Sequence, residues 1–161
     1  MNLQHVTTVL ETPTKETVQA LLEDQSTVFL VDWREEDDAI VEYCEAILQT
    51  GSLLAELIEV ETEEGHELHI QYRSKRVKVP LDYSMADRHI TLCALNDALA
   101  PDYEVRFCID SNGSDTLAFL PLSQSTWKTL ERSYGGEVSK HFYHLTAEPN
   151  LFTGSLPSEW P

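Results

Sequence analysis

Between Ile58 and Leu81 the chain alternates apolar and charged residues, and this period of two restricts the possible folds more than any other feature. Successive side chains of a β-strand point to opposite faces, so the alternation predicts an antiparallel meander with one apolar face and one face in water. Turns are expected at residues 62–65 and 74–75. Because the apolar face must be covered, the meander requires helices packed on it. That face is formed by Ile58, Val60, Leu68, Ile70, Tyr72, Val77, Val79 and Leu81.

Four segments have the apolar spacing, caps and stop signals of helices. The clearest one follows the acidic run 35–38, places apolar residues at intervals of three and four over residues 40–48, and stops at Gly51. A second begins with a capping pattern at Ser84 and ends before Pro101. The other two are expected at residues 13–22 and 124–134.

Three further runs, residues 27–33, 103–109 and 116–122, are rich in strand-forming residues. The last run is apolar at consecutive positions from Leu117 to Leu120, so we expect it at the centre of a sheet, buried on both faces. Residues 137–145 fit either a helix or a strand.

These elements predict an α+β fold, with a mostly antiparallel sheet of about five to six strands and three to four helices packed largely on one face. The length of 161 residues fits a single domain. We place that domain at residues 1–146, because the Pro-rich residues 147–161 show no period and are expected to form an extended C-terminal tail.

The charge of the chain is strongly negative and unevenly distributed. Its 28 acidic and 11 basic residues give a net charge of −17, which disfavours binding to nucleic acids and to anionic membranes. Residues 1–65 hold 16 of the acidic and two of the basic residues. Later in the chain, a basic patch is expected to balance the neighbouring acidic strand through cross-strand pairs. This patch consists of Arg73, Lys75, Arg76 and Lys78.

The acid excess has two interpretations, a solvated surface that aids solubility or a face that binds an electropositive protein. In the second, Trp33 would be an aromatic anchor if it is exposed, whereas a core position at the end of a strand is the alternative. The predicted contact residues are Trp33, Glu35, Glu36, Asp37, Asp38, Glu42 and Glu45, with Glu61, Glu63 and Glu64 as a second prong.

Other residue groups predict little chemistry. Cys44, Cys93 and Cys108 lie among apolar residues and are expected to be reduced core thiols. His141 and His144 have a spacing used in metal sites but lack further ligands nearby, and residues 110–115 are typical of a turn. We therefore expect no catalytic site, metal or cofactor. An N-terminus without a secretory signal predicts a cytoplasmic protein.

In size, in its mixed α/β character and in the acid-rich segments 35–45 and 59–64, the chain resembles small, strongly acidic bacterial immunity proteins. These proteins neutralise a cognate toxin by binding it. The resemblance implies a non-catalytic inhibitor that occludes the active site of a basic toxin, often a nuclease, with its acids in place of phosphates. Two alternatives remain: a structural or regulatory subunit with an apolar interface anchored by Leu151, Phe152 and Trp160, and an enzyme with a perturbed titrating group in a cleft.

Overall fold

The alternating segment forms a three-stranded antiparallel sheet, as expected, but one part of the predicted apolar face is wrong: Ile58 lies opposite Glu67 and therefore on the other face from Leu68. In the computed structural model, which describes residues 2–161, this sheet has the order β2-β3-β4. The strands are β2 (Leu53–Glu59), β3 (His66–Tyr72) and β4 (Lys75–Lys78). Along β3 every second residue is buried, from Leu68 to Tyr72, and these side chains face the helices that cover the sheet.

A separate four-stranded antiparallel sheet has the order β1-β6-β5-β7. Its strands are β1 (Phe29–Asp32), β5 (Tyr103–Cys108), β6 (Thr116–Ser123) and β7 (Phe142–His144). All residues of β6 from Leu117 to Leu122 are buried. The prediction of a central strand buried on both faces is therefore confirmed.

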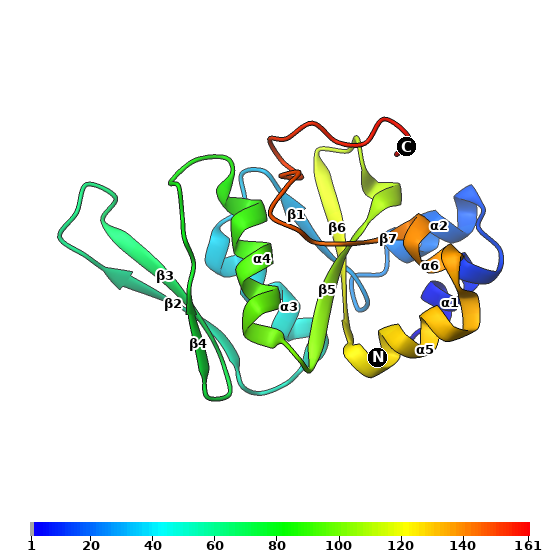
Figure 1. Ribbon diagram of the computed structural model, residues 1–161, viewed down its shortest axis with the longest axis horizontal. Coiled ribbons are helices and arrows are strands. Elements are labelled where there is room, and N and C mark those ends of the chain that lie inside the picture. Colours follow the sequence, from blue (N-terminus) through cyan, green and yellow to red (C-terminus); the bar gives the residue numbers. More distant parts are fainter. Residues whose placement is uncertain (1) are drawn as a thin grey trace.

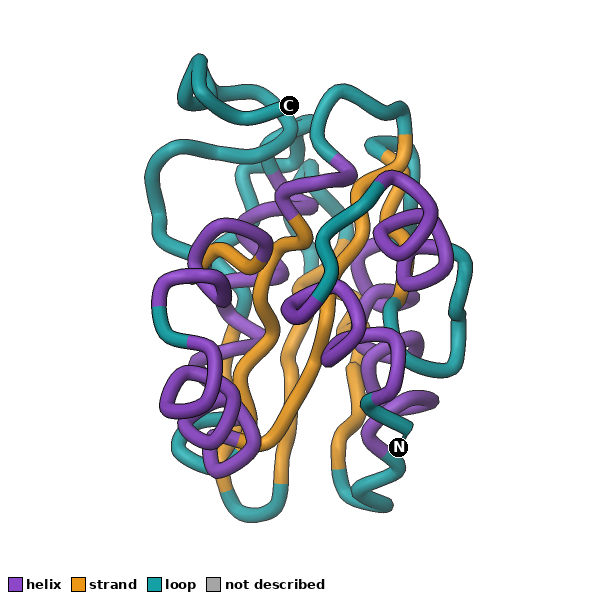
Figure 2. The backbone as a smooth tube through the Cα atoms, turned by 90° about the vertical axis from the view of Figure 1, so that its right-hand side faces the viewer, coloured by secondary structure: helices purple, strands orange, loops and turns teal. Residues whose placement is uncertain are grey.

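The helices form two layers (Figure 1). One layer, α3 (Asp37–Leu48) and α4 (Asp87–Leu99), lies between the two sheets. The other covers the opposite face of the four-stranded sheet and stands in front of the strands in Figure 2. It contains α1 (Gln4–Glu11), α2 (Lys15–Leu22), α5 (Gln124–Tyr134) and α6 (Gly136–His141). None of the helices within residues 2–161 has the length and apolar character needed to cross a bilayer.

The α+β class is correct, but the predicted arrangement within it is not. The described chain has seven strands in two sheets and six helices, and helices cover both faces of the four-stranded sheet. The reason lies in β6, whose two apolar faces each need a cover and so create two separate cores. Helix α1 was not predicted, because its N-cap residue Leu3 makes no side-chain cap. Residues 137–145 contain both alternatives, because nearly all of α6 is followed directly by β7.

Residues 147–161 form no helix or strand and run along one end of the molecule (Figures 1 and 2). Their apolar side chains pack against the core between the sheets. Leu151 is buried, and the Trp160 ring lies 5.6 Å from the Phe107 ring and 4.8 Å from the Tyr143 ring, centroid to centroid. The apolar anchors proposed for a subunit interface are thus engaged within the chain itself.

Candidate protein-binding face

Exposed apolar side chains gather in one part of the molecule. Among residues 2–161, the large apolar side chains with more than a third of their surface exposed all lie between positions 33 and 85. They are Trp33, Tyr43, Leu54, Leu57, Tyr83 and Met85. These residues belong to the end of β1, to α3, to the three-stranded sheet and to the loop before α4. The outer helical layer contributes none of them.

Trp33 lies on the surface, with 42% of its area exposed, so it is not the core residue that was one of its two interpretations. The guanidinium of Arg34 lies over its ring, 5.2 Å from the centroid, and pairs with Asp32. Trp33 and Met85 line the same hollow of about 400 Å³, together with Phe152 of the C-terminal segment. The indole is therefore accessible beside other apolar side chains.

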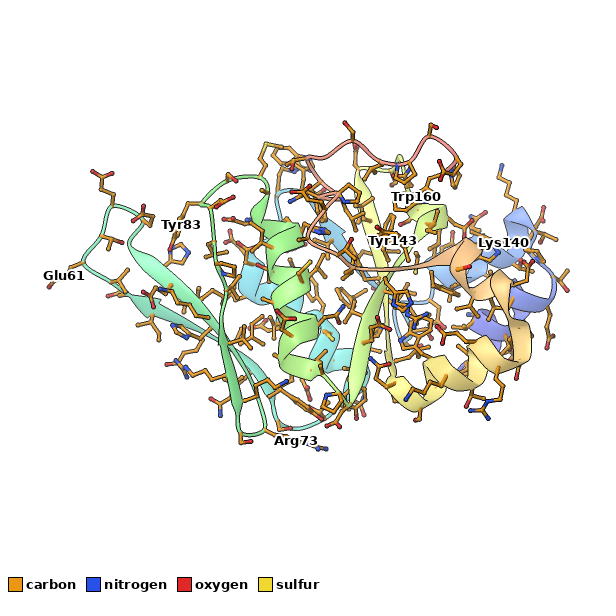
Figure 3. All side chains as sticks on the ribbon, in the orientation of Figure 1. Glu61, Arg73, Tyr83, Lys140, Tyr143 and Trp160 are labelled. Carbon is orange, nitrogen blue, oxygen red and sulfur yellow. The ribbon has the colours of Figure 1, made fainter. Side chains whose placement is uncertain are left out.

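The loop before α4 connects this hollow with the tip of the β2–β3 hairpin. The Tyr83 hydroxyl donates a hydrogen bond to the His66 carbonyl at 2.6 Å, and the two rings meet edge to face. Figure 3 shows Tyr83 beside the hairpin and Glu61 at its tip. Trp33, Met85 and Tyr83 thus lead from the end of β1 toward the acidic hairpin tip.

Several of the predicted acidic residues are positioned to meet a partner. Glu36 and Glu42 are exposed, Asp38 is half-buried, and none of the three forms a hydrogen bond or ion pair through its side chain within residues 2–161. Glu61, Glu63 and Glu64 are exposed around the hairpin tip. At Glu64, hydrogen bonds from its own backbone N–H and from Thr62 lower the pKa of the carboxyl.

Two predicted contact residues have internal roles instead. Asp37 accepts two hydrogen bonds from the Arg88 guanidinium, at 2.7 and 2.8 Å, and one from the Thr91 hydroxyl at 3.1 Å. It thereby ties the start of α3 to α4. Glu45 accepts hydrogen bonds from the Thr50 hydroxyl and the Gly51 N–H, and so holds the turn after α3.

Two more of the predicted residues border the face without being central to it. The Glu35 carboxylate accepts a hydrogen bond from the Tyr43 hydroxyl at 3.1 Å. Glu42 lines a hollow between α3 and β2. The remaining predicted residues and the two exposed residues Tyr83 and Met85 form a surface that we call the Trp33 face. It consists of Trp33, Glu36, Asp38, Tyr83, Met85, Glu61, Glu63 and Glu64.

Charge compensation differs between the two parts of the chain. In residues 2–65, four acidic side chains lie within ion-pair distance of a basic residue or a histidine: Asp24, Asp32, Asp37 and Glu56. In residues 66–161, which hold fewer acids, six do so: Glu67, Asp102, Glu104, Asp110, Glu131 and Glu137. The basic patch contributes three of these ion pairs. Arg76 with Glu56 and Lys78 with Glu67 are the predicted cross-strand pairs, and Arg73 pairs with Asp102 just before β5. Most of the acidic side chains in residues 2–65 therefore have no basic partner within the described chain.

Cys93 lies near His89, but this contact does not create a nucleophile. The Cys93 sulfur lies 3.5 Å from His89 Nε2, but that nitrogen is 2.6 Å from the Thr146 carbonyl oxygen, to which it must donate. The other nitrogen, Nδ1, accepts from the Leu151 N–H. With its Nε2 protonated, His89 offers Cys93 no base, and burial raises the pKa of the Cys93 thiol to about 11. Cys44 and Cys108 are buried free thiols, as predicted, whereas Cys93 is only half-buried and the prediction that it lies in the core is wrong.

An unpredicted pair, Asp110 and His141, borders a hollow of about 520 Å³ next to α2. The carboxylate lies 2.6 Å from His141 Nδ1, which orients the imidazole. The lining of the hollow includes one hydroxyl, that of Thr14, which already caps α2. His144 pairs instead with Glu104. Among residues 2–161, no three His, Cys, Asp or Glu side chains are grouped so that they could hold a metal ion.

Searches against protein-family models, curated proteins and solved structures each find no match to this chain.

Proposed function

We propose that the chain is a non-catalytic inhibitor that binds a basic protein partner through the Trp33 face, in the manner of an immunity protein that neutralises its toxin. One observation carries the proposal. The exposed Trp33, Tyr83 and Met85 lie among acidic side chains that have no counter-charge within residues 2–161.

The two kinds of side chain would serve different steps of binding. Exposed tryptophan and tyrosine are the residues that most often dominate the affinity of an interface, because they bury a large rigid area at a small cost in entropy. Uncompensated acids steer a basic partner and raise its association rate. A surface that combines exposed aromatic side chains with unpaired carboxylates is therefore better explained by binding to a specific partner than by solubility alone.

The chemistry of the acids suggests the kind of partner. Carboxylates on the α3 start and the hairpin tip can pair with lysine and arginine side chains that otherwise contact phosphates. A basic nuclease toxin presents such side chains around its active site. The inhibitor would then act by occlusion, without a catalytic step.

The proposal is tested by capturing partners from a native lysate at low salt and eluting them in salt steps. The matched variants are Glu36→Lys with Glu63→Lys on the face, and Glu16→Lys with Glu23→Lys at α2 in the outer helical layer, since all four side chains are exposed. We expect a basic partner whose association with the purified chain slows about tenfold or more in the first variant and much less in the second. Co-expression should also suppress the toxicity of that partner.

Two results would overturn this assignment. One is a captured protein that is neutral or acidic and stays bound at high salt. The other is an equal loss of association rate in both double variants, because it would reflect net charge alone and not this face.

A further inference from the structure

The free edge of β1 lies beside a groove whose other wall is α3. β1 is the outermost strand of its sheet and pairs with β6 only. The groove has a volume of about 350 Å³. Its lining comes from β1 with the residues before it and from α3 with the residue before its N-cap: Gln25, Val28, Phe29, Leu30, Glu35, Tyr43, Ala46 and Ile47.

The strand register shows which backbone groups of β1 point into this space. Leu30 lies opposite Ala118 of β6. The Ala118 N–H donates to the Ser111 hydroxyl at 2.9 Å, on the side of β5 and away from β1. In an antiparallel pair, hydrogen-bonded and non-hydrogen-bonded positions alternate, so Leu30 and Ala118 form a non-hydrogen-bonded pair. The N–H and C=O of Leu30 therefore point outward, to the open edge.

The helical wall is shaped to receive a side chain. Tyr43, Ala46 and Ile47 have the spacing of one helix face, and the small Ala46 leaves space between its larger neighbours. Ala46 and Ile47 also line a second hollow, of about 530 Å³, that reaches Tyr103 and Thr126. The groove thus continues along α3 toward its C-terminal end, past Ser26 and the start of β1.

The charge of the groove favours a basic occupant. Its lining contains the carboxylate of Glu35 and no lysine or arginine. Glu35 lies near the C-terminal end of β1, and Trp33 is the residue that directly follows β1. The groove is therefore adjacent to the Trp33 face. A segment of a protein bound at the Trp33 face can therefore enter the groove without leaving the surface.

We propose that the groove binds an extended, basic segment of the partner, which adds a strand to the free edge of β1. This inference rests on the proposed function and names how the partner is held. The segment would exchange backbone hydrogen bonds with Leu30, place an apolar side chain against Ala46 and Ile47, and direct a lysine or arginine to Glu35.

The test compares two identical substitutions at exposed alanines on helices, Ala46→Arg in the groove and Ala20→Arg on α2 in the outer layer. With the purified partner, Ala46→Arg should raise the dissociation rate about tenfold, whereas Ala20→Arg should leave it nearly unchanged. In the wild-type complex, hydrogen exchange at the Leu30 amide should slow at least tenfold.

The two proposals fail in different ways. If reversing Glu36 and Glu63 weakens binding but Ala46→Arg acts like Ala20→Arg and Leu30 exchanges as in the free chain, the strand addition is wrong and the Trp33 face stands. If the charge reversals have no effect, the face itself is wrong.

A second measurement needs no natural partner. A seven-residue peptide of alternating lysine and valine should shift the Leu30 amide resonance of the wild-type chain and not that of Ala46→Arg, and a peptide with proline at its centre should have a weaker effect. Absence of any shift would overturn the proposal. So would concentration-dependent dimerisation that Ala46→Arg abolishes, because the occupant would then be a second copy of the chain.

Discussion

Two tryptophans of this molecule each lie under an arginine that pairs with a carboxylate, but one ring is on the surface and the other is in the core. Arg34 lies over Trp33 and pairs with Asp32, and Arg106 lies over Trp127, 4.1 Å from the ring centroid, and pairs with Glu104. Trp33 is 42% exposed, whereas Trp127 is completely buried in the outer helical layer and donates its indole N–H to the Glu104 carbonyl. A combination of tryptophan, arginine and carboxylate thus does not determine a role by itself.

The two sites differ in how many side chains contact the tryptophan and pair with its arginine. Arg106 has a second carboxylate, that of Glu131, and Trp127 also contacts the Phe142 ring. Around Trp33, Glu36 and Asp38 at the start of α3 and the acids at the hairpin tip have no such partners within residues 2–161. In the outer helical layer, the tryptophan and the charges around it are satisfied by contacts within the chain. In the region of β1, α3 and the hairpin, apolar surface and unpaired carboxylates are exposed and can contact another molecule.

The largest difference is expected from removing each indole. Trp127→Ala leaves a cavity in the core beneath the outer helices and should lower the free energy of unfolding by about 4 kcal/mol. Trp33→Ala removes a half-exposed ring and should hardly change stability, but it should weaken partner binding at least tenfold. Urea unfolding of both variants checks the first statement. Equal losses of stability would contradict the contrast between closed and open surroundings.

Removing the arginines is expected to give the next largest contrast. Arg106 is almost fully buried, so Arg106→Met leaves the Glu104 and Glu131 carboxylates without their shared cation and should cost about 3 kcal/mol. Arg34→Met affects an exposed pair and should not change the unfolding midpoint measurably. Chemical denaturation at constant m-value is the measurement. A destabilised Arg34→Met would mean that the Trp33 side also depends on its ion pair.

The sequence was informative wherever one local signal decided the structure. Alternation predicted the meander, and the consecutive apolar residues of β6 predicted its central place. The same strand also contained the reason for two helical layers, but one sequence does not show which helices cover which face. The separation of the strands into two sheets depends on α3 and α4 lying between them, which is a tertiary choice.

The site was predictable only to the level of a segment. Residues 35–38 are uniformly acidic in sequence, yet Asp37 is bound by Arg88, a residue more than fifty positions away along the chain. No local pattern distinguishes it from Glu36. The groove beside β1 was not predicted, for a related reason. A strand is an edge strand because no other strand pairs with it, and the composition of β1 does not show this.

The adjacent acids Glu36 and Asp37 provide a smaller contrast. Asp37 and Arg88 are each 15% exposed at the side chain, so Arg88→Met leaves a mostly buried carboxylate with only the Thr91 hydroxyl, and should cost about 2 kcal/mol. Glu36→Gln should leave the unfolding midpoint unchanged and instead slow association with the partner at low salt. The pair of variants is compared by urea unfolding and stopped-flow mixing. If Glu36→Gln destabilises the fold instead, the side chain is structural and does not belong to the Trp33 face.

The third tryptophan, Trp160, lies between these extremes, and its position depends on a histidine. His89 links α4 to the C-terminal segment through Thr146 and Leu151, and it faces the Cys93 thiol and the more distant Glu148 carboxylate. Burial lowers the pKa of His89, so the folded chain binds this proton less tightly than the unfolded chain does. The stabilisation is complete above the unfolded value of about 6.5 and is lost as the pH falls through the lower folded value.

Acidification should therefore loosen the segment that holds Trp160 and produce the smallest of these effects. Protonated His89 presents an N–H to the Leu151 N–H, which leaves two donors facing each other. In a Trp33→Phe background, tryptophan emission should shift to longer wavelength as the pH falls from above the unfolded value of about 6.5 through the lower folded pKa of His89, while the fold persists. His89→Gln, which cannot take up a proton, should remove this pH dependence. The same red shift in His89→Gln would assign the change to another group, and the end of the chain would then be held independently of α4.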